Sequence, residues 1–563
     1  MDKRYFLLLG IFFLAVAIRL YPLHTYALWG SDNGEYYYIA EELYETGGID
    51  ASSYPGWGKT YPYFPGMFAV VVWVAKAFDI SLLSSLRYTV PVLASLSVII
   101  LYFISMEIFR DRRVSILSAL ILSVTVAHAL VTSHSMPGSL ADPLWLGCIL
   151  LLLRSYRDRR CLPLLYLATI ALIVTHHLTV YFLMISLLIG IAAREIIHPE
   201  WSEKLRIELP YTIFLISATF IFWFLFTNFP EHVLSTAVEG VPSHAYIALT
   251  YFALILLAMV VYALKGKIFR KLSYPDSHNL IKRYITLILV LFVILAIISI
   301  TSIPGTNMNI GMDALLWYLP TLLLFLFFIV GTRFVHFYDD GSFIYGWAIA
   351  ITLSFLFGAV TNSHALIPYR HAQYIAPAIA LLAALGIVKL YDLLSRKRVL
   401  VLSVSALLVL CTITAYPPTS ATAGFNEGIT HKDLEAALWM RDNVPANSVV
   451  ASDHRLSSTI FGFAKLMCTW DSAYDILHAE SFGEALPQLK SCDTPAGKKR
   501  VDYVVVDKTM LEEGVALLQW NNAEPMSERA FEKFFEEPFG LVYENGEVRI
   551  FKVYWERING GMQ

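Results

Sequence analysis

Long hydrophobic segments separated by short loops make up most of residues 1–416 of this chain. The segments are about 20 residues long, the length of a helix that crosses the hydrocarbon core of a bilayer. The chain has 563 residues, of which 57% are hydrophobic and 15% are charged, and its mean hydropathy is +0.59. This pattern predicts a polytopic α-helical membrane protein and is far from that of a soluble domain.

Basic residues are unevenly distributed among the loops that join these segments. Clusters such as RDRR at 110–113 and SRKR at 395–398 stand in one set of loops, whereas the loops near 133–142, 228–243 and 303–312 have no Lys or Arg. Lys and Arg are retained on the cytoplasmic side. The alternation therefore predicts about thirteen spans in the cell membrane, with the N-terminus in the cytoplasm and the C-terminus outside.

The apolar stretch at 62–78 does not fit this alternation as a full span, because it would place the next basic cluster outside. It is also short and flanked by Pro and Lys. We predict a helix that lies partly in the outer leaflet, within a long first outer loop of about 24–87.

The composition changes after the last hydrophobic segment. The sequence at 430–445 is typical of a helix ended by Asn and Pro, those at 447–453 and 500–508 of strands, and Asn545–Gly546 of a hairpin turn. We expect a transmembrane domain over 1–416 and an extracytoplasmic α/β domain over 417–563.

Five cysteines occur without CxxC spacing, which argues against a zinc module. Cys468 and Cys492 lie in the predicted outer domain, where disulfides can form. They are expected either to pair, which would stabilise the domain by roughly 3 kcal/mol, or to remain two buried thiols.

Acidic residues follow the first hydrophobic segment in SDNGEYYYIAEE, residues 31–42. Asp32 and Glu35 are three residues apart, so they share a face if the segment is helical. A carboxylate just outside the bilayer can reach a phosphosugar whose lipid tail stays in the membrane. Glycosyl transfer needs such a group as a base, or as a metal-held carboxylate, and as a partner for the oxocarbenium-like transition state. The alternative is a capping role, with Asp32 as N-cap and Glu35 at N3.

The layout resembles the GT-C superfamily of membrane glycosyltransferases, in particular the catalytic subunit of prokaryotic oligosaccharyltransferases, which also has thirteen spans and an external C-terminal domain. The resemblance covers most of the chain in layout but only short stretches in residues. These are SDNGEYYYIAEE at 31–42, YPYFPGMF at 61–68, SHSMPGSLAD at 133–142, PYRHAQYIAPAIALLAALG at 368–386 and ALWMRDNVPANSVV at 437–450.

The resemblance implies a polyprenyl-phosphate or polyprenyl-pyrophosphate sugar donor and an acceptor that is a protein, a glycan or a lipid. It also implies one essential acid, to which either Asp32 or Glu35 can be aligned. Asp142 corresponds to a loop acid that helps to hold the acceptor or a divalent metal, Mn or Mg, together with Asp32 and Glu35. The family usually has two acids there, as DxD, so Asp142 is alternatively a helix cap.

Arg370 is expected to contact the donor phosphate, flanked by Tyr369 and His371, because it stands in a short outer loop where positive charge is otherwise absent. Its alternative role is an anchor to membrane lipid headgroups. His134 is also a candidate binding residue. For this and the other outer histidines the choice is between metal ligation and an interfacial role, bonded to backbone or lipid headgroups.

Two family motifs are missing. The WWDYG motif is replaced by ASDHRLSSTIFG at 451–462, and the TIxE motif of the fifth outer loop by IPGTNMNIGMD at 303–313. We therefore expect donor chemistry with another acceptor, and no nucleic-acid partner. The competing hypotheses are a transporter or flippase of lipid-linked saccharides, which should show repeated halves and midplane ionisable groups, and a non-catalytic scaffold.

Overall fold

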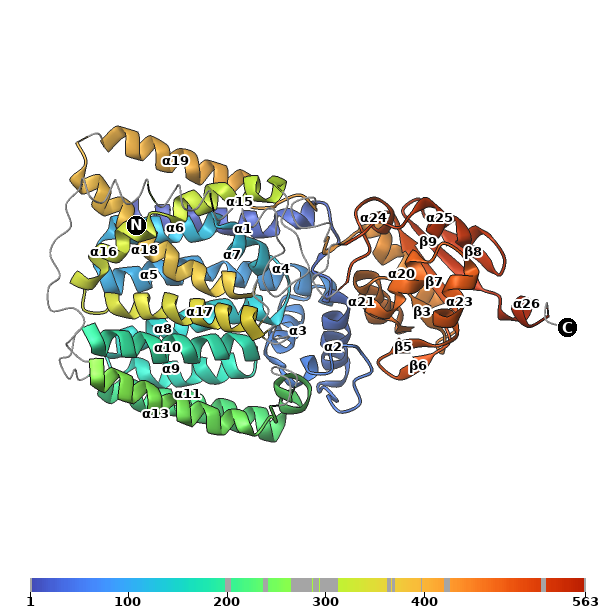
Figure 1. Ribbon diagram of the computed structural model, residues 1–563, viewed down its shortest axis with the longest axis horizontal. Coiled ribbons are helices and arrows are strands. Elements are labelled where there is room, and N and C mark those ends of the chain that lie inside the picture. The colour runs from blue at the N-terminus through green and yellow to red at the C-terminus, as the bar shows by residue number, and fades with distance from the viewer. Residues whose placement is uncertain are drawn as a thin grey trace.

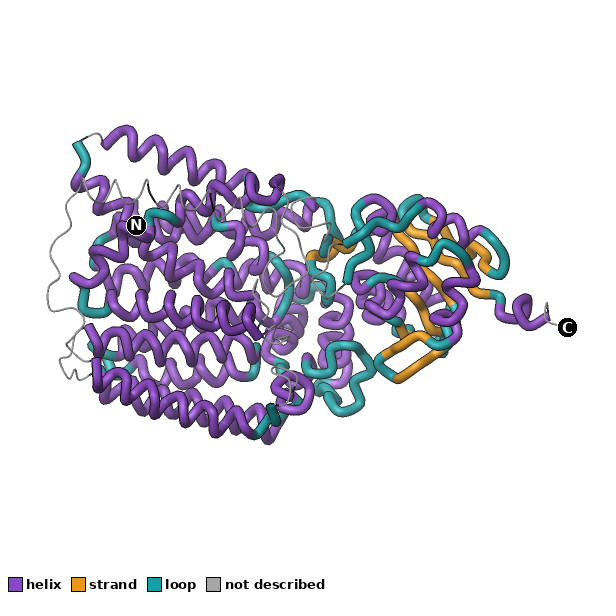
Figure 2. Tube along the Cα trace, in the orientation of Figure 1, coloured by secondary structure: helices purple, strands orange, loops and turns teal. Residues whose placement is uncertain are grey.

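A computed structural model describes residues 3–197, 204–235, 241–264, 312–361, 370–395, 397–419, 426–517 and 523–560, together with 286, 293 and 366. A bundle of helices forms one end of the molecule and a smaller α/β unit the other (Figure 1). The strands lie in the α/β unit and at its junction with the bundle (Figure 2). This division agrees with the predicted fold class.

Apolar sequence forms the helices of the bundle and of the junction. They are α1 (Lys3–Leu20), α2 (Asn33–Thr46), α3 (Gly66–Phe78), α4 (Leu82–Ala94), α5 (Leu96–Phe109), α6 (Arg112–Val124), α7 (Val126–Thr132), α8 (Pro137–Ser155), α9 (Cys161–Ile173), α10 (His177–Ile197), α11 (Leu205–Phe226), α13 (Ala245–Leu264), α15 (Met312–Phe325), α16 (Phe328–Phe334), α17 (Gly341–Thr361), α18 (His371–Leu393) and α19 (Lys397–Ile413).

The chain is a multi-pass membrane protein. Within the described residues, nine helices are long and apolar enough to cross a bilayer, and α6 with α7, bent by 61°, makes a tenth if it is one broken span. Part of the predicted count of about thirteen falls in 265–311, which, apart from Thr286 and Val293, lies outside the described residues.

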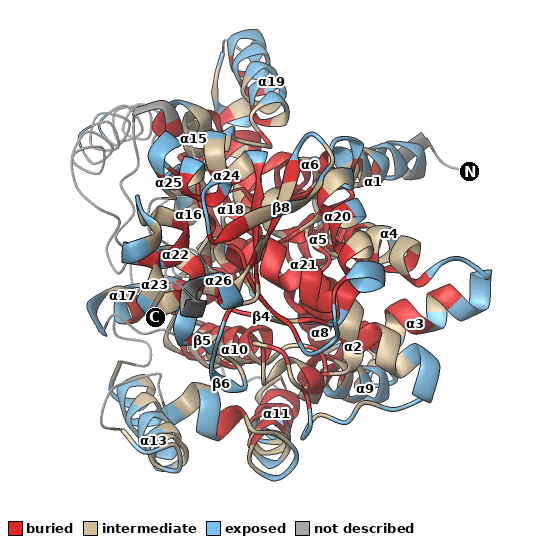
Figure 3. Cartoon of the chain, turned by 90° about the vertical axis from the view of Figure 1, so that its right-hand side faces the viewer, coloured by how far each residue is buried: buried red, intermediate tan, exposed pale blue. Residues whose placement is uncertain are grey.

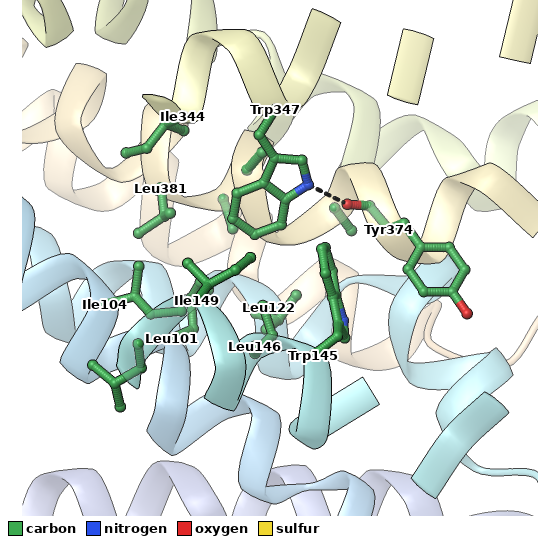
Figure 4. Close-up of a cluster of buried hydrophobic side chains, with 14 of the residues drawn as sticks. Leu101, Ile104, Leu122, Trp145, Leu146, Ile149, Ile344, Trp347, Tyr374 and Leu381 are labelled. Carbon is green, nitrogen blue, oxygen red and sulfur yellow. Dashed lines mark hydrogen bonds between the residues drawn. The ribbon is translucent and has the colours of Figure 1, made fainter. Parts of the chain in front are cut away.

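The interior of the bundle is built from large apolar side chains that interlock between α8, α17 and α18. Trp145 and Trp347 pack edge to face with centroids 4.9 Å apart, and the Trp347 indole donates to the Tyr374 carbonyl at 3.1 Å (Figure 4). Peripheral helices differ, since α13 has no buried residue, as expected of a helix that faces lipid (Figure 3).

The stretch predicted to lie partly in the outer leaflet forms α3, a short helix that is apolar on its buried face and on its exposed face. Phe68 and Val71 are fully buried, whereas Trp73 and Phe78 are 64% and 68% exposed. Together with α2, it runs across the direction of the bundle helices at the junction (Figure 1).

The α/β unit contains a five-stranded sheet in the order β4-β3-β7-β9-β8. Its parallel part joins β3 (Val449–Ala451) to β4 (Met467–Cys468) and β7 (Tyr503–Asp507), with Val450 opposite both Cys468 and Tyr503. The antiparallel part adds the predicted hairpin, β8 (Phe539–Glu544) and β9 (Val548–Val553), with β9 beside β7. Gly546 in its turn has φ +92°, a conformation that favours glycine.

Helices and two small strand pairs complete the unit. They are α20 (His431–Asn443), α21 (His454–Ala464), α22 (Tyr474–His478), α23 (Phe482–Lys490), α24 (Lys508–Glu512), α25 (Glu528–Glu532) and α26 (Trp555–Gly560), the pair β5 (Cys492–Thr494) and β6 (Gly497–Lys499), and the pair β1 (Leu28–Trp29) and β2 (Gly428–Ile429).

The first outer loop and the α/β unit share one hydrophobic core. Strand β1, from the loop, pairs with β2, from the α/β unit. Buried residues of α2 and α3, such as Ile39 and Phe68, belong to the same cluster as Phe461 of α21 and Val504 of the sheet. The loop is therefore packed as part of the α/β unit.

The alternative of two buried thiols holds for Cys468 and Cys492, and the predicted disulfide is wrong. Both cysteines are free and buried. They lie in different sheets, and each donates to a nearby carbonyl, Cys468 to Leu466 and Cys492 to Ser472.

Candidate active site

A cavity of about 560 Å³ lies where the bundle meets the α/β unit. Its walls come from the segment after α1, the turn between α7 and α8, the starts of α10 and α18, and the chain just before β2. The polar and aromatic side chains of the lining include Trp29, Asp32, Tyr61, His134, Arg370 and Glu427.

Asp32 precedes α2, and both of its carboxylate oxygens accept hydrogen bonds. Tyr61 donates to Oδ2 at 2.9 Å and Tyr36 at 3.4 Å, while His454 Nε2 lies 3.1 Å from Oδ1. Burial opposes ionisation, but the hydrogen bond and charge of His454, with Tyr61 and Arg370, outweigh it and hold the pKa of Asp32 below its ordinary value. Asp32 is thus an ionised carboxylate at the cavity wall.

His454 is the first residue of α21, the helix that follows the carboxyl end of β3. Its Nδ1 lies 2.9 Å from Asp471 Oδ1, and the Trp57 ring packs edge-on against the imidazole at 5.2 Å. Burial disfavours the charged ring, but the hydrogen bonds and charges of Asp32 and Asp471 outweigh it and raise the pKa of His454 to about 10. An imidazolium therefore joins the first outer loop to the α/β unit.

Two glycines bring α2 and α21 close enough for this contact. A Cβ on Gly34 would lie 1.9 Å from the Ser458 carbonyl oxygen, and one on Gly462 would lie 2.2 Å from the Gly34 carbonyl oxygen. Tyr37 stacks on Phe463 at 4.3 Å beside this crossing. The helices thus meet backbone to backbone, and their N-termini bring Asp32 and His454 together.

Glu35 occupies a different environment from Asp32, although both follow the first span. Its side chain is fully buried and accepts hydrogen bonds from the backbone N–H groups of Trp57, at 2.5 Å, and Gly58, at 3.0 Å. Burial and the nearby charge of Asp32 raise the pKa of Glu35 to about 7. Glu35 fixes the loop that carries Trp57 and Tyr61.

Two more predicted residues line the same cavity. Arg370 immediately precedes α18, and its charge contributes to the lowered pKa of Asp32. The Nε2 atom of His134 lies 2.6 Å from Glu427 Oε2, and its ring packs beside Trp29 at 5.5 Å. The structure therefore brings together Asp32, Arg370 and His134.

Asp142 and His371 lie inside the bundle, outside the cavity lining. His371 is 2% exposed, and its Nε2 is 2.9 Å from Ser354 Oγ. Asp142 is fully buried, with His128 Nε2 2.9 Å from Oδ2 and the Gln373 amide donating to Oδ1 at 3.0 Å.

Asp142 is one member of a larger buried polar network. Ser97 and Trp145 also donate to its carboxylate, and Arg19 Nη2 lies 2.8 Å from His128 Nδ1. Since Gln373 lines the cavity, this network supports the cavity wall from behind. Tyr369 and residues 303–311, which sequence analysis also singled out, lie outside the described residues.

The predicted metal ligands do not fit a divalent cation. Across the described residues, no group of three His, Cys, Asp or Glu side chains is arranged to hold a metal ion. The six carboxylate oxygens of Asp32, Glu35 and Asp142 each lie at hydrogen-bond distance from a side-chain or backbone group. A shared metal needs oxygens that converge on one point, whereas these three carboxylates lie at the cavity wall, against the Trp57–Gly58 loop and inside the bundle.

Sequence reasoning did not single out His454, Asp471 or Tyr61. The available signal for His454 was its position, because it stands where the resembling family has WWDYG. No spacing rule links it to Asp32, 422 residues away in sequence.

The geometry thus defines a multi-pass membrane protein with a C-terminal α/β unit and a polar cavity where that unit meets the helical bundle. No protein-family model matches the chain, and no curated protein matches it in sequence.

Solved structures do match. One is the crystal structure of the Archaeoglobus fulgidus oligosaccharyltransferase tethered with an acceptor peptide containing the NVT sequon. It is 15% identical, with a TM-score of 0.57 over 90% of this chain and 69% of that chain. The same enzyme in complex with Zn and sulfate is 16% identical, with a TM-score of 0.55 over 89% and 68%.

A further match is ArnT from Cupriavidus metallidurans bound to undecaprenyl phosphate, 11% identical over 96% of this chain and 97% of that chain. Its TM-score is 0.46, at which the two folds cannot be equated. This chain therefore shares the fold of the archaeal enzyme, as the resemblance of the sequence predicted.

Proposed function

We propose that this protein is a membrane glycosyltransferase. It transfers a sugar or glycan from a polyprenyl-phosphate or polyprenyl-pyrophosphate donor to a protein, glycan or lipid acceptor at the outer face of the membrane. The observation that carries the proposal is that Asp32 and Arg370 line one cavity at the end of the bundle. An anion-binding cation beside an ionised carboxylate is what a phosphosugar requires.

Of Asp32 and Glu35, we assign Asp32 as the catalytic carboxylate. Its carboxylate lies on the cavity wall, whereas both oxygens of Glu35 are held by backbone N–H groups of the loop. In the reaction, the acceptor oxygen or nitrogen attacks the anomeric carbon, its bond to the phosphate oxygen breaks, and Asp32 accepts the acceptor's proton. The same carboxylate stabilises the oxocarbenium character of the transition state.

Arg370 is assigned to the donor phosphate. A guanidinium pairs bidentately with phosphate oxygens and retains its charge near the membrane. Arg370 directly precedes α18, which is long and apolar enough to cross the bilayer, and this supports a position at headgroup depth, where a lipid-linked phosphate would lie. As the bond to the sugar breaks, the leaving phosphate gains charge, so this pairing strengthens in the transition state.

The acceptor side of the cavity combines aromatic and acidic groups. We assign Trp29, His134, Glu427 and Glu513, which line the same cavity, to this side. The archaeal oligosaccharyltransferase was crystallised with a sequon peptide, but the WWDYG motif of that family is replaced here by the segment that supplies His454. We therefore assign this chain an acceptor other than a sequon.

The test is transfer by the purified protein in nanodiscs, with labelled sugars on polyprenyl phosphate and polyprenyl pyrophosphate and with protein, glycan and lipid acceptors. The wild type should transfer from one donor class. Asp32→Asn should lower the rate at least about a hundredfold, the usual contribution of a positioned proton acceptor. The control is Asp50→Asn, an exposed carboxylate of the same outer loop, which should keep the wild-type rate.

Two results would contradict the proposal. An Asp32→Asn protein with wild-type turnover would remove Asp32 from the chemistry. Movement of the intact donor between leaflets, without cleavage of the sugar–phosphate bond, would instead support a transporter.

A further inference from the structure

The contact between Asp32 and His454 has an unusual feature, since both ring nitrogens of His454 face carboxylates. Nε2 lies 3.1 Å from Asp32 Oδ1 and Nδ1 lies 2.9 Å from Asp471 Oδ1. A neutral imidazole has one N–H, so it can donate to one of these oxygens and must turn a lone pair toward the other. Two ionised carboxylates are both satisfied when the ring is doubly protonated.

The imidazolium is held in a fixed place. The His454 side chain is 2% exposed, Trp57 covers one edge, and helix α21 is locked against α2 by the Gly34–Gly462 contact. The acidic groups around the ring are Asp32 and Asp471 at hydrogen-bond distance, and Glu35 farther away, whose pKa is affected by the charge of His454. The two carboxylates therefore favour a positively charged ring in a fixed place beside the carboxylate that lines the cavity.

A metal ion bound to a catalytic carboxylate holds that carboxylate in position and adds positive charge to the site. Among the described residues, the three carboxylates predicted as metal ligands do not converge on a metal site, and one oxygen of Asp32 is bonded to the His454 ring. The imidazolium performs both of these tasks without a metal. It also comes from the α/β unit, so the site is complete only when that unit is docked.

We infer that His454 takes the place of a divalent cation at Asp32, as a positioning residue that the α/β unit contributes, so that the site works without a bound metal. This inference rests on the proposed glycosyltransferase function. In the reaction described above, His454 keeps both protons, so no proton moves along the ring and the atoms balance as before.

The first measurement does not require activity. Mn²⁺ binding to the purified protein is followed by titration calorimetry and by its electron paramagnetic resonance signal. We expect the wild type to bind no Mn²⁺ at Asp32. The wild type and Asp32→Asn should therefore bind Mn²⁺ to the same extent. His454→Asp, which would group three carboxylates with Asp32 and Asp471, should gain one Mn²⁺ per molecule. The inference is overturned if the wild type binds one Mn²⁺ and Asp32→Asn abolishes it.

The second measurement is transfer with EDTA and with Mn²⁺. Wild-type turnover should agree within about twofold in the two conditions, since no metal takes part. In His454→Gln, kcat should fall by about tenfold to a hundredfold, with little change in donor KM, because the substitution removes a fixed charge at the reacting centre. His454→Asp should recover part of its turnover only with Mn²⁺, a rescue that loss of folding would not give.

The matched control is His431→Gln, an exposed histidine at the start of α20 in the same unit, which should behave as wild type in both buffers. Unchanged turnover in His454→Gln, or wild-type transfer that EDTA stops and Mn²⁺ restores, would overturn the inference. If no donor gives transfer with the wild type, the proposed function fails, and the Mn²⁺ binding experiment still decides the role of His454.

Discussion

Asp32 and Glu35 show how two carboxylates of one short segment acquire different properties. The His454 imidazolium holds Asp32 ionised, whereas burial and the charge of Asp32 raise the pKa of Glu35 to about 7. Environments that separate the pKa values of neighbouring acids are typical of catalytic sites. At the residue scale, the sequence predicted the pair but could not choose between its members, because the choice depends on where the Trp57–Gly58 loop folds.

The raised pKa of Glu35 predicts a pH-dependent stability. The folded protein keeps the Glu35 proton up to about pH 7, whereas the unfolded chain loses it near the ordinary value of 4.5. Folding is therefore progressively less favourable as pH rises from about 4.5 to 7, by on the order of 3 kcal/mol in total, and changes no further above that range.

Glu35→Gln removes this titration. The apparent Tm of the variant, measured relative to that of the wild type, should rise between pH 4.5 and 7. Asp50→Asn, in the same loop, serves as the control. If the Tm difference between Glu35→Gln and the wild type stays constant with pH, Glu35 is ionised throughout the range.

Arg370 gives a prediction about donor use. Replacing it with Ala removes the phosphate partner, and a contact that strengthens in the transition state affects turnover as well as binding. We expect donor kcat/KM to fall at least about 10²-fold, equivalent to about 2.7 kcal/mol. Arg370→Lys should restore only part of this loss, because an ammonium cannot pair bidentately. Unchanged donor kinetics in Arg370→Ala would leave Arg370 as an anchor to lipid headgroups.

At the element scale, the close crossing of α2 and α21 decides whether Asp32 meets His454. Gly34→Ala introduces a methyl group 1.9 Å from a backbone oxygen of α21, which forces the helices apart. A displacement of about 1 Å at a catalytic group costs about a hundredfold in rate. Transfer by Gly34→Ala should therefore fall by about that factor, with a lowered Tm.

The control is Gly147→Ala in α8, whose added methyl group would meet no atom within 4 Å. It should retain wild-type transfer. A Gly34→Ala protein with wild-type turnover would show that the helix crossing does not position the site.

The elements themselves were largely predictable, because hydrophobic length, basic loops and strand patterns are local signals. The helix α3, the hairpin at Gly546 and the helix α20 were predicted from such signals. The role of His454 could not be predicted from local signals, because the fold brings it to Asp32 from 422 residues away in the sequence. Asp142 was predicted to be a loop acid or a helix cap, but it lies buried within α8. Its burial depends on four neighbours contributed by other helices or its own turn.

For the whole molecule, the positive-inside pattern predicts that the α/β unit lies outside the cell. Single cysteines at exposed positions test this in a Cys161→Ser background, since the other four cysteines are buried. A membrane-impermeant maleimide should label Glu435→Cys, on α20, in intact cells. It should label Arg112→Cys, in a basic loop, only after the membrane is permeabilised. The reverse pattern would invert the orientation.

The shared core also predicts which helices unfold together. Phe461 of α21 is 3% exposed, stacks on Tyr38 of α2 at 4.7 Å and contacts Trp470 at 5.5 Å. Phe461→Ala creates a cavity that costs about 3–5 kcal/mol. Because α2 and α21 belong to one cluster, we expect hydrogen exchange to increase in both helices, while α8 and α10 of the bundle keep their wild-type protection.

Leu381→Ala, at a fully buried position in the bundle core, is the matched substitution. It should increase exchange in α8 and α10 and leave α2 and α21 with wild-type protection. Exchange is measured by mass spectrometry in nanodiscs, at one pH and temperature for all three proteins. If Phe461→Ala opens α21 and leaves α2 protected, the first outer loop belongs energetically to the membrane bundle. In that case docking of the α/β unit would be separable from folding of the loop that carries Asp32. If both helices open together, loop and outer unit form one cooperative unit, and Asp32 is in position only when His454 is.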